Sequence, residues 1–124
     1  MTKKILLIED SPLSRKHEER LLSEKGFEVI SSDNLKDAER LYSERTDWYA
    51  VISDNTFFVA PRGEVRPDLG IDLTLRIKKA NPTLRVALVT SYLSGELKQR
   101  TEEEGIYAIF KSEFSNKIDD FLKE

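Results

Sequence analysis

The sequence predicts an α/β fold, a doubly wound parallel sheet with helices on both faces. Three observations lead to this prediction. Short apolar stretches alternate with longer, charged or amphipathic stretches five times along the 124 residues. Several apolar stretches lack polar alternation, which is typical of strands buried on both faces of a parallel sheet. A regular strand–helix order requires parallel strands joined by right-handed crossovers.

The first strand is expected at residues 4–8, and two acids, Glu9 and Asp10, follow it directly. A helix is expected at residues 12–25, because a serine suited to the N-cap and a proline suited to the first turn precede it and Gly26 ends it. The sole histidine has no partner spaced for metal binding and is interpreted as a partly buried surface residue. The inner face is predicted to carry three leucines, with the histidine on or near it: Leu13, Leu21, Leu22 and His17.

The second strand is expected at residues 27–31, and a short helix follows with apolar residues at helical spacing from Leu35 to Tyr42. The third strand gives the strongest signal, because the five residues from Trp48 to Ile52 are apolar without a break. This strand ends on Asp54. Ligands of open α/β sheets collect beyond the carboxyl ends of the strands, so an acid there is a candidate for chemistry.

Residues 55–69 show no periodicity and contain two prolines and a glycine, which predicts a long loop. Its Phe57-Phe58-Val59 start is expected to pack partly against the core, and the sequence leaves open whether the loop is decoration or a lid or partner surface. The alternation then resumes in this order: helix 70–80, strand 84–89, helix 94–104, strand 106–110, and a final helix with Phe114, Ile118, Phe121 and Leu122 on one face.

The composition indicates one soluble domain over residues 1–124, with 39% apolar and 35% charged residues. A net charge of −3 without a basic block argues against direct nucleic-acid binding. The absence of cysteine excludes disulfides and thiolate chemistry. No stretch is long enough for a signal peptide or membrane insertion, so a cytoplasmic location is expected.

Polar residues at four strand ends are expected to converge on one edge of the sheet. Glu9 and Asp10 follow the first strand, Asp54 ends the third, Thr90 follows the fourth and Lys111 follows the fifth. Three carboxylates placed together repel one another unless a positive charge intervenes. Mg²⁺ suits such a site because it prefers hard oxygen ligands. The hydroxyl and the ammonium are suited to phosphoryl oxygens.

With these residues in this order, the chain resembles the receiver domains of two-component response regulators along nearly its whole length. The resemblance implies the strand order 2-1-3-4-5 and a phosphoacceptor role for Asp54. It also implies that Thr90 and Lys111 bind the phosphoryl group. The ligands implied for Mg²⁺ are Glu9, Asp10, Asp54 and the backbone carbonyl of Thr56.

The function implied by the resemblance is that of a stand-alone phosphoacceptor. A histidine kinase or histidine phosphotransfer protein would donate the phosphoryl group to Asp54, and the phosphorylated form would bind an unidentified protein target. Such a protein is not an enzyme beyond its own phosphorylation and dephosphorylation.

Three departures from the family pattern qualify this interpretation. Ser112 replaces the usual proline after the lysine, which leaves the bond between Lys111 and Ser112 open to either isomer. Ala108 replaces the usual aromatic residue of the switch, and the segment at 55–69 is about twice the expected length.

These departures keep an alternative open, a pseudo-receiver that binds proteins without phosphorylation. A different α/β enzyme or nucleotide binder is disfavoured, because no Gly-x-Gly-x-x-Gly motif or Walker lysine loop is present.

Overall fold

The computed structural model describes residues 2–123. Its main sheet has five parallel strands in the order β2-β1-β3-β6-β7. This is the predicted order 2-1-3-4-5, because β6 and β7 are the fourth and fifth strands of this sheet. The strands are β1 (Lys4–Ile8), β2 (Glu28–Ser32), β3 (Trp48–Asp54), β6 (Arg85–Thr90) and β7 (Tyr107–Phe110).

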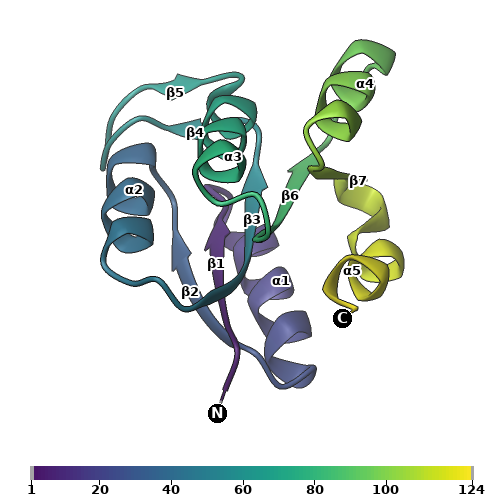
Figure 1. Cartoon of the computed structure of the whole chain (residues 1–124). Helices are drawn as coiled ribbons and strands as arrows, with labels where there is room; N and C mark the ends of the chain where they lie inside the picture. Colours follow the sequence, from purple (N-terminus) through teal and green to yellow (C-terminus); the bar gives the residue numbers. More distant parts are fainter. Residues whose placement is uncertain (1, 124) are drawn as a thin grey trace.

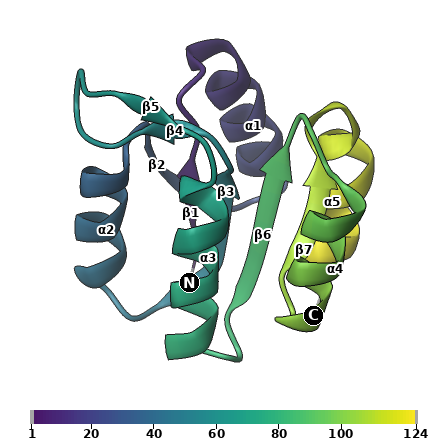
Figure 2. The same cartoon turned by 90° about the horizontal axis from the view of Figure 1, so that it is seen from above.

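Helices cover both faces of the sheet (Figures 1 and 2). On one face pack α1 and α5, and on the other α2, α3 and α4. No helix within residues 2–123 is long and apolar enough to cross a membrane. The helices are α1 (Pro12–Glu24), α2 (Leu35–Ser43), α3 (Leu69–Ala80), α4 (Gly95–Glu103) and α5 (Phe114–Leu122), with a 3₁₀ turn, η1 (Lys111–Glu113), before α5.

Each face of the sheet has its own apolar core. Along β1, Leu6 and Ile8 belong to the core under α2 and α3, whereas Ile5 and Leu7 belong to the core under α1 and α5. Successive strand residues point to opposite faces. A strand between two cores therefore needs an uninterrupted apolar run, as the sequence predicted for β1 and β3.

The predicted helix starts are confirmed at the level of hydrogen bonds. The Ser11 hydroxyl accepts from the Ser14 amide at 3.4 Å. The side chain of Asn34 accepts from the Asp37 amide at 2.8 Å and caps α2. Gly26 follows α1 with a φ of 96°, in the left-handed region that glycine adopts without strain. Local chemistry thus sets where these helices begin and end.

The predicted inner face of α1 is partly wrong. Leu13 is 83% exposed. His17 is also exposed rather than partly buried. The residues that α1 does bury are Glu18 and Leu22, four positions apart on one face of the helix.

The segment predicted as a loop folds into a small antiparallel hairpin of β4 (Phe57–Phe58) and β5 (Val65–Arg66). Figure 1 shows the hairpin near the start of α2, where the Lys36 amide donates to the Val59 carbonyl at 3.0 Å. Phe57 is fully buried in the core under α2 and α3, so part of the segment packs down as expected.

Candidate functional site

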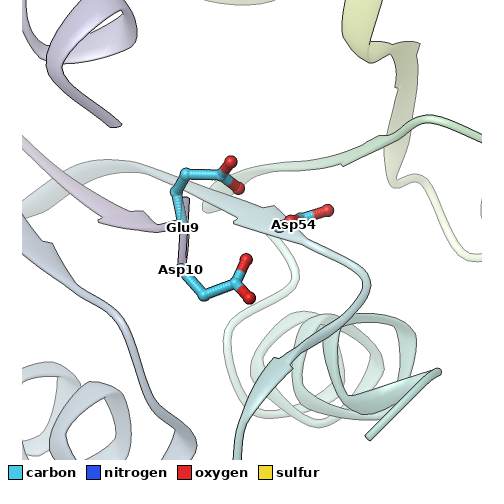
Figure 3. A group of neighbouring side chains, drawn as sticks. All are labelled: Glu9, Asp10 and Asp54. Carbon is cyan, nitrogen blue, oxygen red and sulfur yellow. The ribbon is translucent and has the colours of Figure 1, made fainter. Parts of the chain in front are cut away.

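Four of the five predicted side chains meet at the carboxyl edge of the sheet. Strand register explains this, because Ile8 pairs with Ser53 and the next residues, Glu9 and Asp54, lie beside each other. Carboxylate oxygens of Glu9, Asp10 and Asp54 lie within 4.8 Å of one another. Figure 3 shows the three carboxyl groups gathered at the ends of β1 and β3. Three hard oxygen ligands at this spacing suit a divalent cation such as Mg²⁺.

The fourth side chain is that of Lys111, which follows β7 and begins the 3₁₀ turn. Its Nζ atom donates to Glu9 Oε1 at 2.5 Å and lies 3.6 Å from Asp54 Oδ2. The peptide bonds of the described residues are all trans, including that between Lys111 and Ser112. The ammonium therefore lies between two buried carboxylates without a proline after it.

Glu9 and Asp10 have raised pKa values. Glu9 is 1% exposed, and burial together with a hydrogen bond to Asp54 raises its pKa to about 8, although the hydrogen bond from Lys111 acts in the opposite direction. Burial and the charge of Asp54 also raise the pKa of Asp10. Burial would lower the pKa of Lys111, but the hydrogen bond to Glu9 and the charge of Asp54 outweigh it and raise that pKa. The site holds more negative charge than its single lysine balances.

Asp54 is held in a fixed orientation. One carboxylate oxygen, Oδ1, accepts from the Asn55 amide at 2.8 Å. The other oxygen, Oδ2, faces Lys111. Next to it, the Ser53 hydroxyl donates to the Asp54 carbonyl at 2.8 Å. One oxygen is thus fixed by the backbone and the other is turned toward the cationic side of the site.

Asn55 and Gly70, which the sequence analysis did not identify as site residues, join the end of β3 to the start of α3. The Asn55 side chain accepts from the Ile71 amide at 2.9 Å, and it donates to Asp68 at 3.1 Å. A β-carbon on Gly70 would collide with the Asp54 carbonyl oxygen and with the Cα atom of Asn55. The only sequence signal for this close approach was a glycine at the expected start of a helix.

Thr90 lies at the same edge, but its hydroxyl is directed to its own turn. It donates to the Tyr92 carbonyl at 3.1 Å and accepts from the Tyr92 amide at 3.2 Å. Thr56 is exposed, two residues beyond Asp54. Both threonines line a groove of about 600 Å³ that runs beside the site toward Arg100 of α4. Within residues 2–123, neither threonine hydroxyl forms a hydrogen bond with Glu9, Asp10 or Asp54.

A fourth acid, Glu18, lies close enough to influence the site. It is 3% exposed, and burial raises its pKa to about 7, with the charge of Lys111 lowering it and that of Asp54 raising it further. The sequence analysis did not identify Glu18. The sequence signal that could have found it is its spacing of four residues from Leu22, which places a carboxyl on the face of α1 that should be apolar.

No family model matches the sequence, and no curated protein is significantly similar to it. Solved structures, by contrast, are similar to nearly the whole chain. A response regulator receiver domain protein from Clostridium thermocellum has a TM-score of 0.71 at 23% identity, over 97% of this chain and 94% of that one. A response regulator from Burkholderia pseudomallei, solved with a phosphorylated aspartic acid, a calcium ion and citrate, has a TM-score of 0.78 at 19% identity, over 98% of this chain and 66% of that one.

A chain of the CheX–CheY–BeF₃–Mg²⁺ complex from Borrelia burgdorferi has a TM-score of 0.77 at 16% identity. That match covers 98% of this chain and 90% of the other. These likenesses confirm the fold that was predicted from the alternation of strands and helices and from the resemblance to receiver domains.

Proposed function

We propose that this chain, which has the fold of the receiver domains of response regulators, accepts a phosphoryl group on Asp54. The observation that carries the proposal is the meeting of three carboxylates and one lysine at the carboxyl edge of the sheet. The Burkholderia neighbour with its phosphorylated aspartic acid supports the same chemistry by analogy. Residues 1–124 would form one such receiver domain.

The donor set fits Mg²⁺. Glu9, Asp10 and Asp54 offer oxygen atoms within reach of one ion, and the backbone carbonyl of Thr56 is the fourth protein ligand proposed. A bound Mg²⁺ would neutralise charge on the acids and on the incoming phosphoryl oxygens. Burial, and after it the neighbouring Asp54, raises the pKa of Glu9, and a bound cation would favour the ionised form of this carboxyl.

In the proposed reaction, a carboxylate oxygen of Asp54 attacks the phosphorus atom of a phosphohistidine. An oxygen–phosphorus bond forms as the nitrogen–phosphorus bond breaks, and the leaving imidazole nitrogen takes a proton. Lys111 lies 3.6 Å from Asp54 and would pair with the new phosphoryl oxygens. Thr90 would turn its hydroxyl from Tyr92 toward the same oxygens, which requires breaking two hydrogen bonds within its turn.

The proposed donor is a histidine kinase or a histidine phosphotransfer protein, and the proposed output is binding to a protein target. Receivers are signalling modules, so the chain would act as a switch rather than as an enzyme on other substrates. A pseudo-receiver that binds partners without phosphorylation is the second candidate. The engaged hydroxyl of Thr90 and the small Ala108 side chain favour it, because both weaken the usual route from site to surface.

Labelling with phosphoramidate or acetyl phosphate, followed by intact-protein mass measurement, tests the proposal. We expect one phosphoryl group on the wild-type chain with Mg²⁺, and none with chelator or after Asp54→Asn. Asp120→Asn, which changes an exposed aspartate of α5, is the matched control and should be labelled normally. A wild-type chain that folds, binds Mg²⁺ and is still not labelled would favour the pseudo-receiver.

A further inference from the structure

Asn55 follows Asp54 directly, and its polar side chain is buried, with the residue only 8% exposed. A buried polar group costs stability unless its hydrogen bonds are satisfied. Both ends of this amide are satisfied, since its oxygen accepts from the Ile71 amide at 2.9 Å and its nitrogen donates to Asp68 Oδ1 at 3.1 Å. The role of the Asn55 side chain therefore lies in these two bonds.

The two bonds join the two ends of the segment that contains the hairpin. Asn55 is at the start of this segment, whereas Asp68 is at its end and Ile71 lies in the first turn of α3. Asp68 comes directly before α3 with a φ of 63°, in the left-handed region, and its own side chain does not cap the helix. The oxygen of Asn55 accepts from the first turn instead. The start of α3 is thus capped by the residue that follows β3.

The backbone of Asn55 is bonded to the site. Its amide donates to Asp54 Oδ1 at 2.8 Å. Along the chain, Asn55 lies between Asp54 and Thr56, which carry two of the oxygen ligands proposed for the cation. Only the φ and ψ angles of Asn55 separate the peptide group that is bonded to Asp54 from the next one toward Thr56. The bonds that fix the Asn55 side chain therefore also restrain the backbone on both sides of it.

Asn34 offers a comparison within the same chain. It is also buried, with 3% exposed, and its side chain caps α2 by accepting from the Asp37 amide at 2.8 Å. Within residues 2–123, it forms no hydrogen bond with Glu9, Asp10 or Asp54. These two asparagines therefore have similar burial and the same capping chemistry, but only Asn55 is bonded to the site.

We propose that Asn55 is a positioning residue of the site. By joining Asp68 to the start of α3, its side chain holds the Asp54 carboxylate and the Thr56 carbonyl in the arrangement that binds a divalent cation and accepts the phosphoryl group. This inference rests on the proposed function, because it takes Asp54 as the phosphoacceptor and as a ligand of the cation. The Asn55 side chain would act through its own backbone rather than by contact with the cation. Groups that orient metal ligands in this way commonly change metal affinity by tenfold or more.

The test compares Asn55→Ala with Asn34→Ala, because each variant removes a buried helix cap. Both should lower the urea midpoint. We expect only Asn55→Ala to weaken Mg²⁺ binding, by about tenfold in a titration followed by amide chemical shifts. The same variant should be labelled by phosphoramidate about tenfold more slowly at saturating Mg²⁺. Without Mg²⁺, its Ile71 amide should exchange faster with solvent, because the acceptor of that amide is gone. Asn34→Ala should match wild type in all three measurements.

Asp68→Gly is a second variant, which serves if Asn55→Ala does not fold. Glycine adopts a φ of 63° without strain, so this variant removes the acceptor of the Asn55 nitrogen and keeps the backbone. It should weaken Mg²⁺ binding by about threefold, as expected for the loss of one hydrogen bond.

Wild-type Mg²⁺ affinity and labelling rate in Asn55→Ala, or in Asp68→Gly where Asn55→Ala does not fold, would overturn the inference and leave the proposed function intact. Equal losses in Asn55→Ala and Asn34→Ala would also overturn it, because the effect would then follow stability alone. A wild-type chain that neither binds Mg²⁺ nor is labelled would refute the proposed function, and the inference with it.

Discussion

Lys111 pairs with two of the three acids of the site. Its ammonium is 2.5 Å from Glu9 and 3.6 Å from Asp54, so it is placed to move from one carboxylate toward a phosphoryl group on the other. A side chain that responds in this way is expected to transmit phosphorylation rather than to hold the fold together.

Lys111→Met should therefore leave the fold intact and abolish the response to phosphorylation. We expect the amide chemical shifts of α4 and β7 to change when wild type is labelled with phosphoramidate, and to stay nearly unchanged in the labelled variant. Lys117→Met is the control, because that lysine is exposed on α5 and pairs with Glu113 at 4.0 Å. Shift changes of wild-type size in Lys111→Met would rule out this role.

The meeting of Glu9, Asp54 and Lys111 could be predicted from sequence because parallel strands end on one edge of a sheet. The direction of the Thr90 hydroxyl could not, since it depends on a two-residue turn with Tyr92. Glu18 was also missed. Its influence on the site depends on the rotation of α1 about its own axis where it packs on the sheet. The periodicity of the sequence alone does not determine this rotation.

At the scale of elements, the start of α3 is packed directly on the end of β3. The Gly70 amide donates to the Asn55 carbonyl at 3.0 Å, and the Asn55 side chain caps the helix in place of the residue that precedes it. Backbone touches backbone here, so the position of Asp54 depends on the absence of a side chain at Gly70.

Gly70→Ala should destabilise the protein by about 2–3 kcal/mol, because the added carbon would collide with backbone atoms that cannot move aside easily. Urea unfolding measures this. Gly95→Ala is a good control, since a β-carbon at the start of α4 meets nothing within 4 Å and should leave stability nearly unchanged. Equal urea midpoints for the two variants would show that stability does not require the close approach of Gly70 to the end of β3.

The strands and helices of the main fold were predictable within a residue or two from apolar runs and caps, but the β4–β5 hairpin was not. Its strands have two residues each, too few for a pattern to be read. The burial of Phe57 was foreseen only as partial packing, and it is complete. The conformation of the hairpin depends on contacts between residues that are distant in sequence, such as the isolated bridge between Phe58 and Asn34.

Phe57→Ala should destabilise the protein by about 3–4 kcal/mol, as expected for removal of a large side chain from a core. Phe58→Ala, at the neighbouring half-buried position, should cost clearly less. Comparing the two variants by urea unfolding tests whether the β4–β5 hairpin is part of the core. Similar small losses in both variants would mean that the hairpin is only a surface decoration.

For the whole molecule, the raised pKa values of Glu9 and Glu18 make stability depend on pH. Both acids bind protons more tightly in the folded chain, with pKa values of about 8 and about 7 against 4.5 in the reference state. At pH values between the reference pKa of 4.5 and the raised pKa values, the folded state holds more protons than the unfolded state. The free energy of unfolding should therefore fall as pH rises from about 4.5 to about 8.

In the presence of chelator, the chain should resist urea better at about pH 5.5 than at about pH 8. Adding Mg²⁺ at the higher pH should recover stability, because the ion binds the folded state and neutralises the acids. Glu18→Leu should reduce the pH dependence by removing one of the two groups. A chelated wild type that is more stable at the higher pH would contradict this account of the site.

The attachment of the hairpin to α2 has one further consequence, for hydrogen exchange. Lys36 lies in the first turn of α2, where backbone amides have no acceptor within their own helix. Its amide is instead bonded to the Val59 carbonyl of the hairpin. Protection of this single amide therefore depends on the hairpin staying docked, while the amides of later turns report on the helix itself. The exchange rate of Lys36, compared with that of Arg40, would measure how often the hairpin lifts from the rest of the molecule.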